Sequence, residues 1–366
     1  MKFSIEKDNF IKTLGSTQSV VERRNTIPIL NNIMVEAKSG ILSITGTDMD
    51  IAIFASTEIQ SVSDGSTTIP AGPLFDIIKK LPEGAQISVE LDDDNILISA
   101  GRSQFKLPSL PADEFPVMTG GEMPFSFEIG SNELLDLIEN TRFAISNEET
   151  RYYLNGIYFH EMDGVLRAVA TDGHRLAKAE TVAPSTTKGM PGIIVPKKAI
   201  NELYKLLEQT DSDVQVNLSE NRIKFQLNST TITSKLVDGT FPDYKRVIPQ
   251  GNDIKLRVNC NLFSEAVERV ATLSDSKMAP IKVTIGNGML KLFASTPQLG
   301  TASDEVEVEY KGEELEIGFN ARYLNDIANQ IKNSEMIFEL KDSSSPSIIK
   351  NTDNKNALYV LMPMRV

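Results

Sequence analysis

Few residues of this chain could do acid–base chemistry, and two of them lie in one turn. Asp172 and His174 stand two residues apart, and His160 is the only other histidine in the chain. A carboxylate beside an imidazole could serve general-base catalysis. The run Thr171-Asp172-Gly173 is also typical of a turn, in which a short polar side chain bonds its own backbone and glycine accepts a positive φ. We favour the turn and keep an enzyme that uses Asp172 and His174 as the alternative.

The other candidates for chemistry are weaker. A zinc site with two histidines would need His160 and His174, which flank a predicted hairpin. Asp92-Asp93-Asp94 could attract a cation, but its place at a predicted hairpin tip favours a solvated turn. The sequence contains no phosphate-binding glycine loop and no Cys-x-x-Cys pair. We therefore expect no metal site, no cofactor and no catalytic residue.

The stretch around Asp172 recurs twice. Thr47, Thr171 and Ser295 are successively 124 residues apart, and so are Gly40, Gly164 and Gly288, each of which ends a predicted hairpin turn. Phe115-Pro116 returns as Phe241-Pro242, and Ile69-Pro70 returns as Val195-Pro196, each at a slightly longer interval. Several kinds of landmark at nearly one period indicate a threefold repeat whose unit has the size of an ordinary domain.

Each repeat is itself predicted to be doubled. Ile5 and Ile69 begin two similar cycles of strand, helix and three strands, about half a period apart. Glycine and asparagine turns between the strands favour antiparallel sheets, with the helices on one face. We expect an α+β fold of three repeated domains, each a doubled β-α-β-β-β unit, over 1–122, 123–250 and 251–366.

Composition restricts the cellular setting. The chain has 366 residues, a net charge of −13, 40% hydrophobic residues and one cysteine. It lacks an apolar run long enough for a membrane helix and lacks a signal peptide, so we expect a cytoplasmic protein. An acidic chain is a poor candidate for tight phosphate binding, although it can still carry a local basic surface. Basic side chains gather on or beside the predicted helices, which fits either an ordinary solvated surface or a nucleic-acid-binding face. In the second case we expect Lys12, Arg24, Lys197 and Lys198 to face the DNA.

Specific motifs then indicate a family. Thr171-Asp172-Gly173-His174-Arg175-Leu176, Arg151-Tyr152-Tyr153-Leu154-Asn155-Gly156, Phe241-Pro242-Asp243-Tyr244 and the terminal Met362-Pro363-Met364-Arg365 resemble the bacterial sliding clamps, the β subunits of DNA polymerase III. The resemblance covers the whole chain in order. It implies a non-catalytic processivity factor that forms a head-to-tail homodimer ring, with helices lining the hole and sheets forming the outer wall. The ring would encircle duplex DNA.

The resemblance also implies partners and their site. The partners would be the polymerase III alpha subunit, the clamp-loader delta subunit, and other polymerases and repair proteins that carry clamp-binding peptides. The peptide pocket would use residues from three distant segments: Leu154, Thr171, Gly173, His174, Arg175, Leu176, Pro242, Arg246, Val247, Val360, Met362, Pro363, Met364 and Arg365. We expect the arginines to lie at its margin. Arg24, Tyr152 and Tyr153 would contact DNA.

Three positions depart from the family's pattern. Gly72 and Glu148 stand where the family has an arginine and a glutamine, which predicts weaker direct contacts with DNA. Pro346 replaces a serine at the rim of the pocket.

The dimer seam is predicted from the strands. Gln104–Leu107 reads as an edge strand with two apolar side chains, and an open edge must be covered. We expect Phe105 and Leu107 to pack near Thr272 and Leu273 of a second copy. A monomeric, β-rich adaptor that binds peptides without encircling DNA is the remaining alternative.

Overall fold

The computed structural model describes residues 1–22, 26–118, 121–273, 279–332 and 334–365. The α-helices are α1 (Lys7–Gln18), α2 (Ala71–Lys80), α3 (Ser131–Arg142), α4 (Lys197–Leu207), α5 (Cys260–Ala271) and α6 (Ala321–Ile331). Short 3₁₀ turns are η1 (Pro28–Asn31), η2 (Ala112–Glu114), η3 (Glu149–Leu154), η4 (Ser185–Thr187) and η5 (Tyr244–Arg246).

The strands alternate buried and exposed side chains, as the sequence pattern predicts for sheets with one covered face. The first repeat has β1 (Lys2–Glu6), β2 (Asn32–Lys38), β3 (Ile41–Thr47), β4 (Ile51–Glu58), β5 (Gln60–Ser63), β6 (Gly65–Pro70), β7 (Gln86–Asp92), β8 (Asn95–Ala100) and β9 (Ser103–Pro108). The second has β10 (Phe125–Ile129), β11 (Gly156–Met162), β12 (Val165–Thr171), β13 (Arg175–Val182), β14 (Ile193–Pro196), β15 (Val214–Leu218), β16 (Arg222–Leu227) and β17 (Thr230–Lys235). The third has β18 (Ile254–Asn259), β19 (Pro280–Gly286), β20 (Met289–Thr296), β21 (Gly300–Glu307), β22 (Glu309–Tyr310), β23 (Leu315–Asn320), β24 (Glu335–Leu340), β25 (Ser347–Asn351) and β26 (Ala357–Leu361).

Each of the six helices follows one strand and precedes three, so the β-α-β-β-β unit occurs twice in every repeat as predicted. Two short strands, β5 and β22, lie between the halves of the first and third repeats and were not foreseen.

The strands form four antiparallel sheets, two of which cross a boundary between repeats. Their orders are β5-β1-β7-β8-β9, β10-β15-β16-β17-β4-β3-β2-β6, β14-β11-β12-β13-β26-β25-β24-β18-β22 and β21-β20-β19-β23. β4 of the first repeat pairs with β17 of the second, and β13 of the second pairs with β26 of the third. In both cases the last strand of a repeat's first half joins the last strand of the next repeat's second half.

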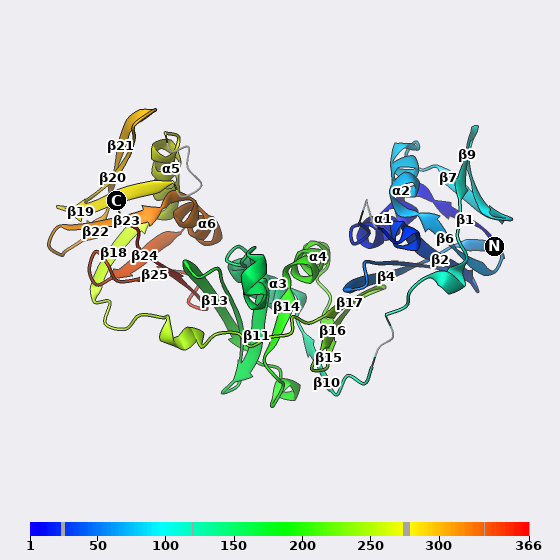
Figure 1. Ribbon diagram of the computed structural model, residues 1–366, viewed down its shortest axis with the longest axis horizontal. Coiled ribbons are helices and arrows are strands. Elements are labelled where there is room, and N and C mark those ends of the chain that lie inside the picture. The colour runs from blue at the N-terminus through cyan, green and yellow to red at the C-terminus, as the bar shows by residue number, and fades with distance from the viewer. Residues whose placement is uncertain (23–25, 119–120, 274–278, 333, 366) are drawn as a thin grey trace. The chain divides into compact units, whose positions relative to one another are not determined.

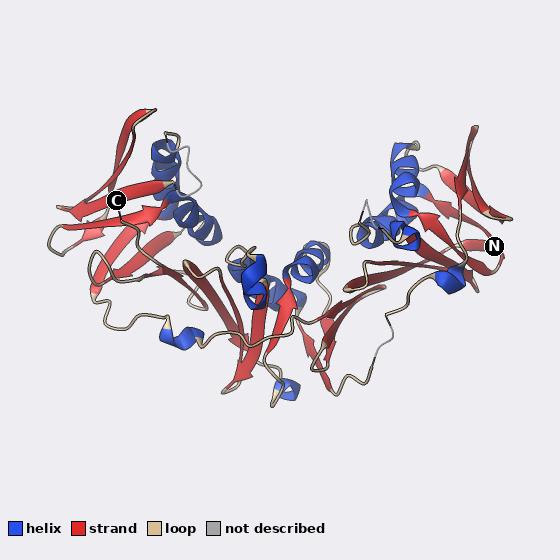
Figure 2. Ribbon diagram, viewed as in Figure 1, coloured by secondary structure: helices blue, strands red, loops and turns tan. Residues whose placement is uncertain are grey.

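Two compact units result from this pairing. The first comprises Met1–Leu135, Pro184–Thr187 and Lys198–Leu236, and the second comprises Asp136–Ala183, Lys188–Lys197 and Val237–Val366. Within the first unit α1 lies beside α2, and within the second α5 lies beside α6 (Figure 1). In each unit the helices cover one side of the sheets (Figure 2).

The core of the first unit shows how the repeat is held. Phe3 of β1 meets Phe10 of α1 edge to face, with ring centroids 6.2 Å apart. Leu14 and, from α2, Leu74 and Ile78 are fully buried beside them. The apolar side chains recur at helical spacing on the face that meets the sheet, so burial fixes both helices against it.

Candidate functional site

Three segments that are distant in sequence supply one apolar cluster in the second unit. Leu154, Leu176 and Val360 are each at most 3% exposed and pack together with Val169, Ile194, Phe241 and Tyr244. Leu154 ends η3, Leu176 lies on β13 and Val360 lies on β26, and the pairing of Leu176 with Val360 across these strands fixes their meeting. These three predicted pocket residues therefore form a buried floor.

The exposed members of the predicted pocket lie on the same chain segments as these buried residues. Val247 is 45% exposed and Met362 is 38% exposed. Pro242, Arg246, Gly173, His174 and Arg365 are also exposed, whereas Pro363 and Met364 are half-buried. Large exposed apolar side chains beside a preformed apolar floor are a suitable surface for apolar anchors of a ligand.

The C-terminal tail is held in place by its backbone. β26 ends at Leu361, before the proline that cannot continue a ladder. Beyond it, the amide of Met362 donates to the carbonyl of His174 at 3.0 Å, and the amide of Met364 donates to the carbonyl of Gly318 at 2.8 Å. The tail thus bridges the turn before β13 and the strand β23.

The Asp172 turn uses its polar groups internally. The Asp172 carboxylate accepts the amides of His174 at 2.9 Å and Arg175 at 3.0 Å, and Thr171 Oγ1 donates to the carbonyl of Arg175 at 2.6 Å. Gly173 has φ +90°, which an L side chain rarely adopts, and a Cβ there would meet Arg151. The interpretation of this stretch as a turn is confirmed, and its carboxylate is already engaged.

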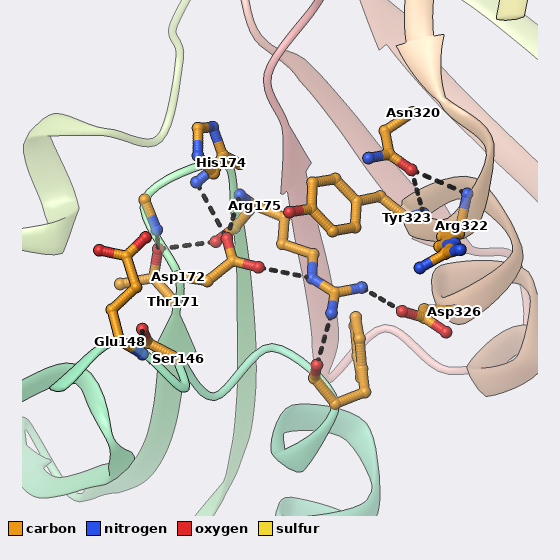
Figure 3. Close-up of polar contacts among 12 residues, drawn as sticks. Ser146, Glu148, Thr171, Asp172, His174, Arg175, Asn320, Arg322, Tyr323 and Asp326 are labelled. Atoms are coloured by element: carbon orange, nitrogen blue, oxygen red, sulfur yellow. Dashed lines mark hydrogen bonds and ion pairs between the residues drawn. The ribbon is translucent and has the colours of Figure 1, made fainter. Parts of the chain in front are cut away.

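We expected Arg175 to lie at the margin of the peptide pocket, but the structure nearly buries its side chain. Its side chain is 9% exposed and donates to three oxygens: Asp172 at 3.1 Å, Asp326 at 2.5 Å and the carbonyl of Phe143 at 2.7 Å. Its guanidinium also lies 4.3 Å from the centre of the Tyr323 ring. Figure 3 shows Arg175 reaching from Asp172 to Asp326 of α6. Its burial and its contacts with three oxygens hold the turn to α6 and to the end of α3.

Several residues of this region were not foreseen. His160 Nε2 lies 3.0 Å from the hydroxyl of Tyr244 in η5, and its ring stacks on Tyr158 with centroids 5.0 Å apart. Tyr158 stacks in turn on Phe241 at 4.8 Å. Burial, with Arg167 and Lys245 nearby, lowers the pKa of His160 from 6.5 to about 4, so the ring is neutral. This aromatic stack fixes the segment that carries Pro242, Arg246 and Val247.

The predicted DNA-facing residues have different surroundings. Lys12 of α1 and Tyr152 are exposed, whereas Tyr153 is half-buried and meets Tyr152 edge to face at 5.8 Å. Lys197 donates to Asn147 Oδ1 at 2.6 Å. Lys198 pairs with Asp48 and also donates to the carbonyl of Val20, so its charge is largely engaged within the chain. Arg24 lies outside the described residues.

The residues predicted for the dimer seam lie on an edge strand, β9, and directly after a helix, α5. Phe105 and Leu107 are half-buried on β9, which ends its sheet in the described part of the chain. Thr272 directly follows α5 and is exposed, and the half-buried Leu273 follows it. We expect the contact with β9 to extend over Ala271–Lys277, of which residues 274–277 are outside the described residues.

Among the residues that the structure describes, no group of three or more His, Cys, Asp or Glu could hold a metal ion. In the same residues, no helix is both long and apolar enough to cross a membrane.

Comparison with known proteins identifies the family. Residues 1–119, 128–243 and 245–365 match the N-terminal, central and C-terminal domains of the DNA polymerase III beta subunit. The chain belongs to the DNA polymerase III beta subunit family. A beta sliding clamp of Caulobacter vibrioides is 46% identical over all of both chains. The sliding clamp of Bartonella birtlesii, solved with griselimycin bound, is 48% identical with a TM-score of 0.98, and that of Pseudomonas aeruginosa is 40% identical with 0.96, each over 100% of both chains.

Family membership settles several expectations from the sequence. The three-domain clamp fold and the resemblance to the sliding clamps are confirmed. The family is a DNA sliding clamp, a processivity factor rather than a catalytic enzyme, so the enzyme alternative with Asp172 and His174 is discarded.

Proposed function

We propose that two copies of the chain close head to tail into a ring around duplex DNA, and that the cluster around Leu154, Leu176 and Val360 tethers the replicative polymerase. The observation that carries the ring is the repeated strand pairing. β4 joins β17 and β13 joins β26, each linking a first half to the next repeat's second half. By the same rule, β21 of the third repeat would pair with a β9 strand. In the described part of the chain, β9 and β21 are each the last strand of their sheet and have one unpaired edge.

A second copy supplies the missing partner. The β9 strand of one chain and the β21 strand of another would continue the same antiparallel pattern, and two such seams close a twofold ring. Phe105 and Leu107 on β9, with Thr272 and Leu273 at the end of α5, lie at these edges. The proposed domains are 1–122, 123–250 and 251–366, each contributing one third of a subunit.

The peptide site takes an extended segment with apolar anchors. The buried floor and the exposed Val247, Met362 and Pro242 support this assignment, with Arg246 and Arg365 available to a polar or acidic neighbour. One buried leucine or phenylalanine anchor contributes about 1.5–3 kcal/mol, so a two-anchor peptide would bind near micromolar. The occupants we propose are the polymerase III alpha subunit, the clamp-loader delta subunit, and other polymerases and repair proteins.

DNA would be held topologically, with weak electrostatic contacts. A chain of net charge −13 can slide on DNA if only local basic side chains meet the phosphates. We propose Lys12, Arg24, Lys197, Tyr152 and Tyr153 for these contacts, and we give Lys198 a smaller part because Asp48 engages it. We expect the ring to act in the cytoplasm.

Encirclement is tested by loading the protein on nicked circular plasmid with a clamp loader and then linearising the DNA. We expect gel filtration to show retention on the circle and loss from the linear form, because a ring leaves over a free end. Equal retention on both forms would contradict encirclement and favour a peptide-binding adaptor that attaches to DNA directly.

A further inference from the structure

One acidic side chain occupies the same place in all three second-half helices. Asp76 is the sixth residue of α2, Glu202 is the sixth of α4, and Asp326 is the sixth of α6. Glu202 and Asp326 lie where one repeat joins the next. Each is linked by hydrogen bonds to the residue that directly follows the first helix of the neighbouring repeat.

The first junction uses a hydroxyl. Ser19 follows α1, and its Oγ lies 2.6 Å from Glu202 Oε2. Lys205, three residues after Glu202, donates to the other carboxylate oxygen at 2.8 Å. Glu202 is only 8% exposed, so the hydroxyl and the ammonium together compensate for the burial of its charge.

The second junction makes the equivalent link through Arg175. Phe143 follows α3, and its carbonyl accepts Arg175 Nη2 at 2.7 Å, while Nη1 donates to Asp326 Oδ2 at 2.5 Å. The two junctions use different residues, but in both the carboxylate of the second-half helix is linked to the C-terminal end of the first-half helix of the preceding repeat.

The third position has the same kinds of side chain as the first junction, but no residue in the described part of the chain forms a hydrogen bond or ion pair with the Asp76 carboxylate. Asp76 is exposed, and Lys79 follows it by three residues, as Lys205 follows Glu202. Thr272 follows α5, as Ser19 follows α1, and is also exposed. Thr272 Oγ1 lies 3.1 Å from the carbonyl of Glu268, and Ser19 Oγ lies 2.9 Å from that of Ser16, so both hydroxyls sit on the last turn of their helices.

We propose that Thr272 of one copy donates its hydroxyl hydrogen bond to Asp76 of a second copy, with Lys79 of that second copy holding the other carboxylate oxygen. The inference rests on the proposed homodimer and names a polar contact at its seam. The contact becomes buried when β9 meets β21, and a hydroxyl bonded to a carboxylate inside an interface is stronger than the same pair in water.

The test is the dissociation constant of the dimer, measured with the full chain by sedimentation over a dilution series. We expect Thr272→Val to raise it about tenfold, because the isosteric change leaves a buried carboxylate without its donor. Thr272→Ser retains the hydroxyl and should stay within about twofold of the unmodified chain. Asp94→Ala, which removes a carboxylate from the exposed hairpin between β7 and β8, controls for net charge and should leave the constant unchanged.

A double-mutant cycle decides whether the two residues meet. Asp76→Ala and Thr272→Val should weaken the dimer by less together than the product of their separate effects, because either change removes the same bond. Independent effects, or no effect of Thr272→Val, would overturn this contact while leaving the homodimer intact. An unmodified chain that stays monomeric at micromolar concentration would instead overturn the proposed ring.

Discussion

At the scale of single residues, the side chains suited to chemistry serve to position others. Asp172 holds the amides of its own turn, Arg175 joins that turn to α6, and His160 joins β11 to η5. The exposed residues His174, Pro242 and Val247, which we propose for the peptide pocket, lie on segments that these contacts fix. Rigid support of this kind keeps a binding surface preformed, which reduces the entropy that a ligand must overcome.

The neutral state of His160 predicts a pH dependence of stability. Its pKa is about 4 in the fold against an ordinary 6.5, so the unfolded chain binds the proton more readily between these values. The stabilisation is complete above pH 6.5 and is lost as the pH falls towards 4. We expect the melting temperature of His160→Gln to fall less than that of the unmodified chain between pH 7 and pH 4.5.

The control for this measurement is the other histidine. His174 is exposed and lies outside the aromatic stack, so His174→Gln separates the loss of the buried ring from the loss of an imidazole elsewhere in the chain. Parallel curves for His160→Gln and the unmodified chain would show that the stacked imidazole does not carry the effect.

At the scale of elements, the C-terminal tail can be separated from the strand before it. Deleting residues 362–366 removes Met362 from the site and two backbone hydrogen bonds, but leaves β26 and its pairing with β13 complete. We expect the truncated chain to stay a folded dimer and to lose at least tenfold in affinity for a peptide of the type Gln-Leu-x-Leu-Phe, measured by fluorescence titration.

A matched control tests whether the loss is specific. Val182 is an exposed apolar residue at the end of β13 in the same unit, and Val182→Ala should bind the peptide normally. Full affinity in the truncated chain would place the peptide site elsewhere.

The sequence predicted the elements well because its signals were local. Glycine turns and alternating apolar residues located the strands, and the recurrence of Thr47 at Thr171 located the repeats. The pairing of β13 with β26 and the contact of Arg175 with Asp326 join residues far apart in sequence. No local pattern records such partners, so Arg175 was expected at the margin of the pocket although its side chain is nearly buried.

At the scale of the whole molecule, we expect the retention of the proposed ring on circular DNA to include a weak electrostatic attraction between basic side chains and phosphates. Lys12 is an exposed cation on α1, and Lys12→Glu should reduce retention of the loaded protein on circular DNA, more at low salt than at high salt. Its melting temperature should not change, because its side chain is solvated. Retention is measured by gel filtration at several salt concentrations.

Two further reversals separate DNA contact from folding. Lys38→Glu, at the exposed end of β2, should leave retention unchanged. Lys198→Glu should instead lower the melting temperature, because it places a second carboxylate beside Asp48. Unchanged retention of Lys12→Glu at low salt would exclude Lys12 from the DNA path.

The sheets that run from one repeat into the next have a consequence for dissecting the protein. A fragment excised as the middle repeat alone would carry β17 and β13 without β4 and β26, and so would present two bare strand edges to other molecules. Such edges recruit neighbouring chains and promote aggregation during expression. Fragments designed for separate study should therefore follow the two compact units, with their partner strands joined by engineered connections, rather than the domain boundaries predicted from the sequence.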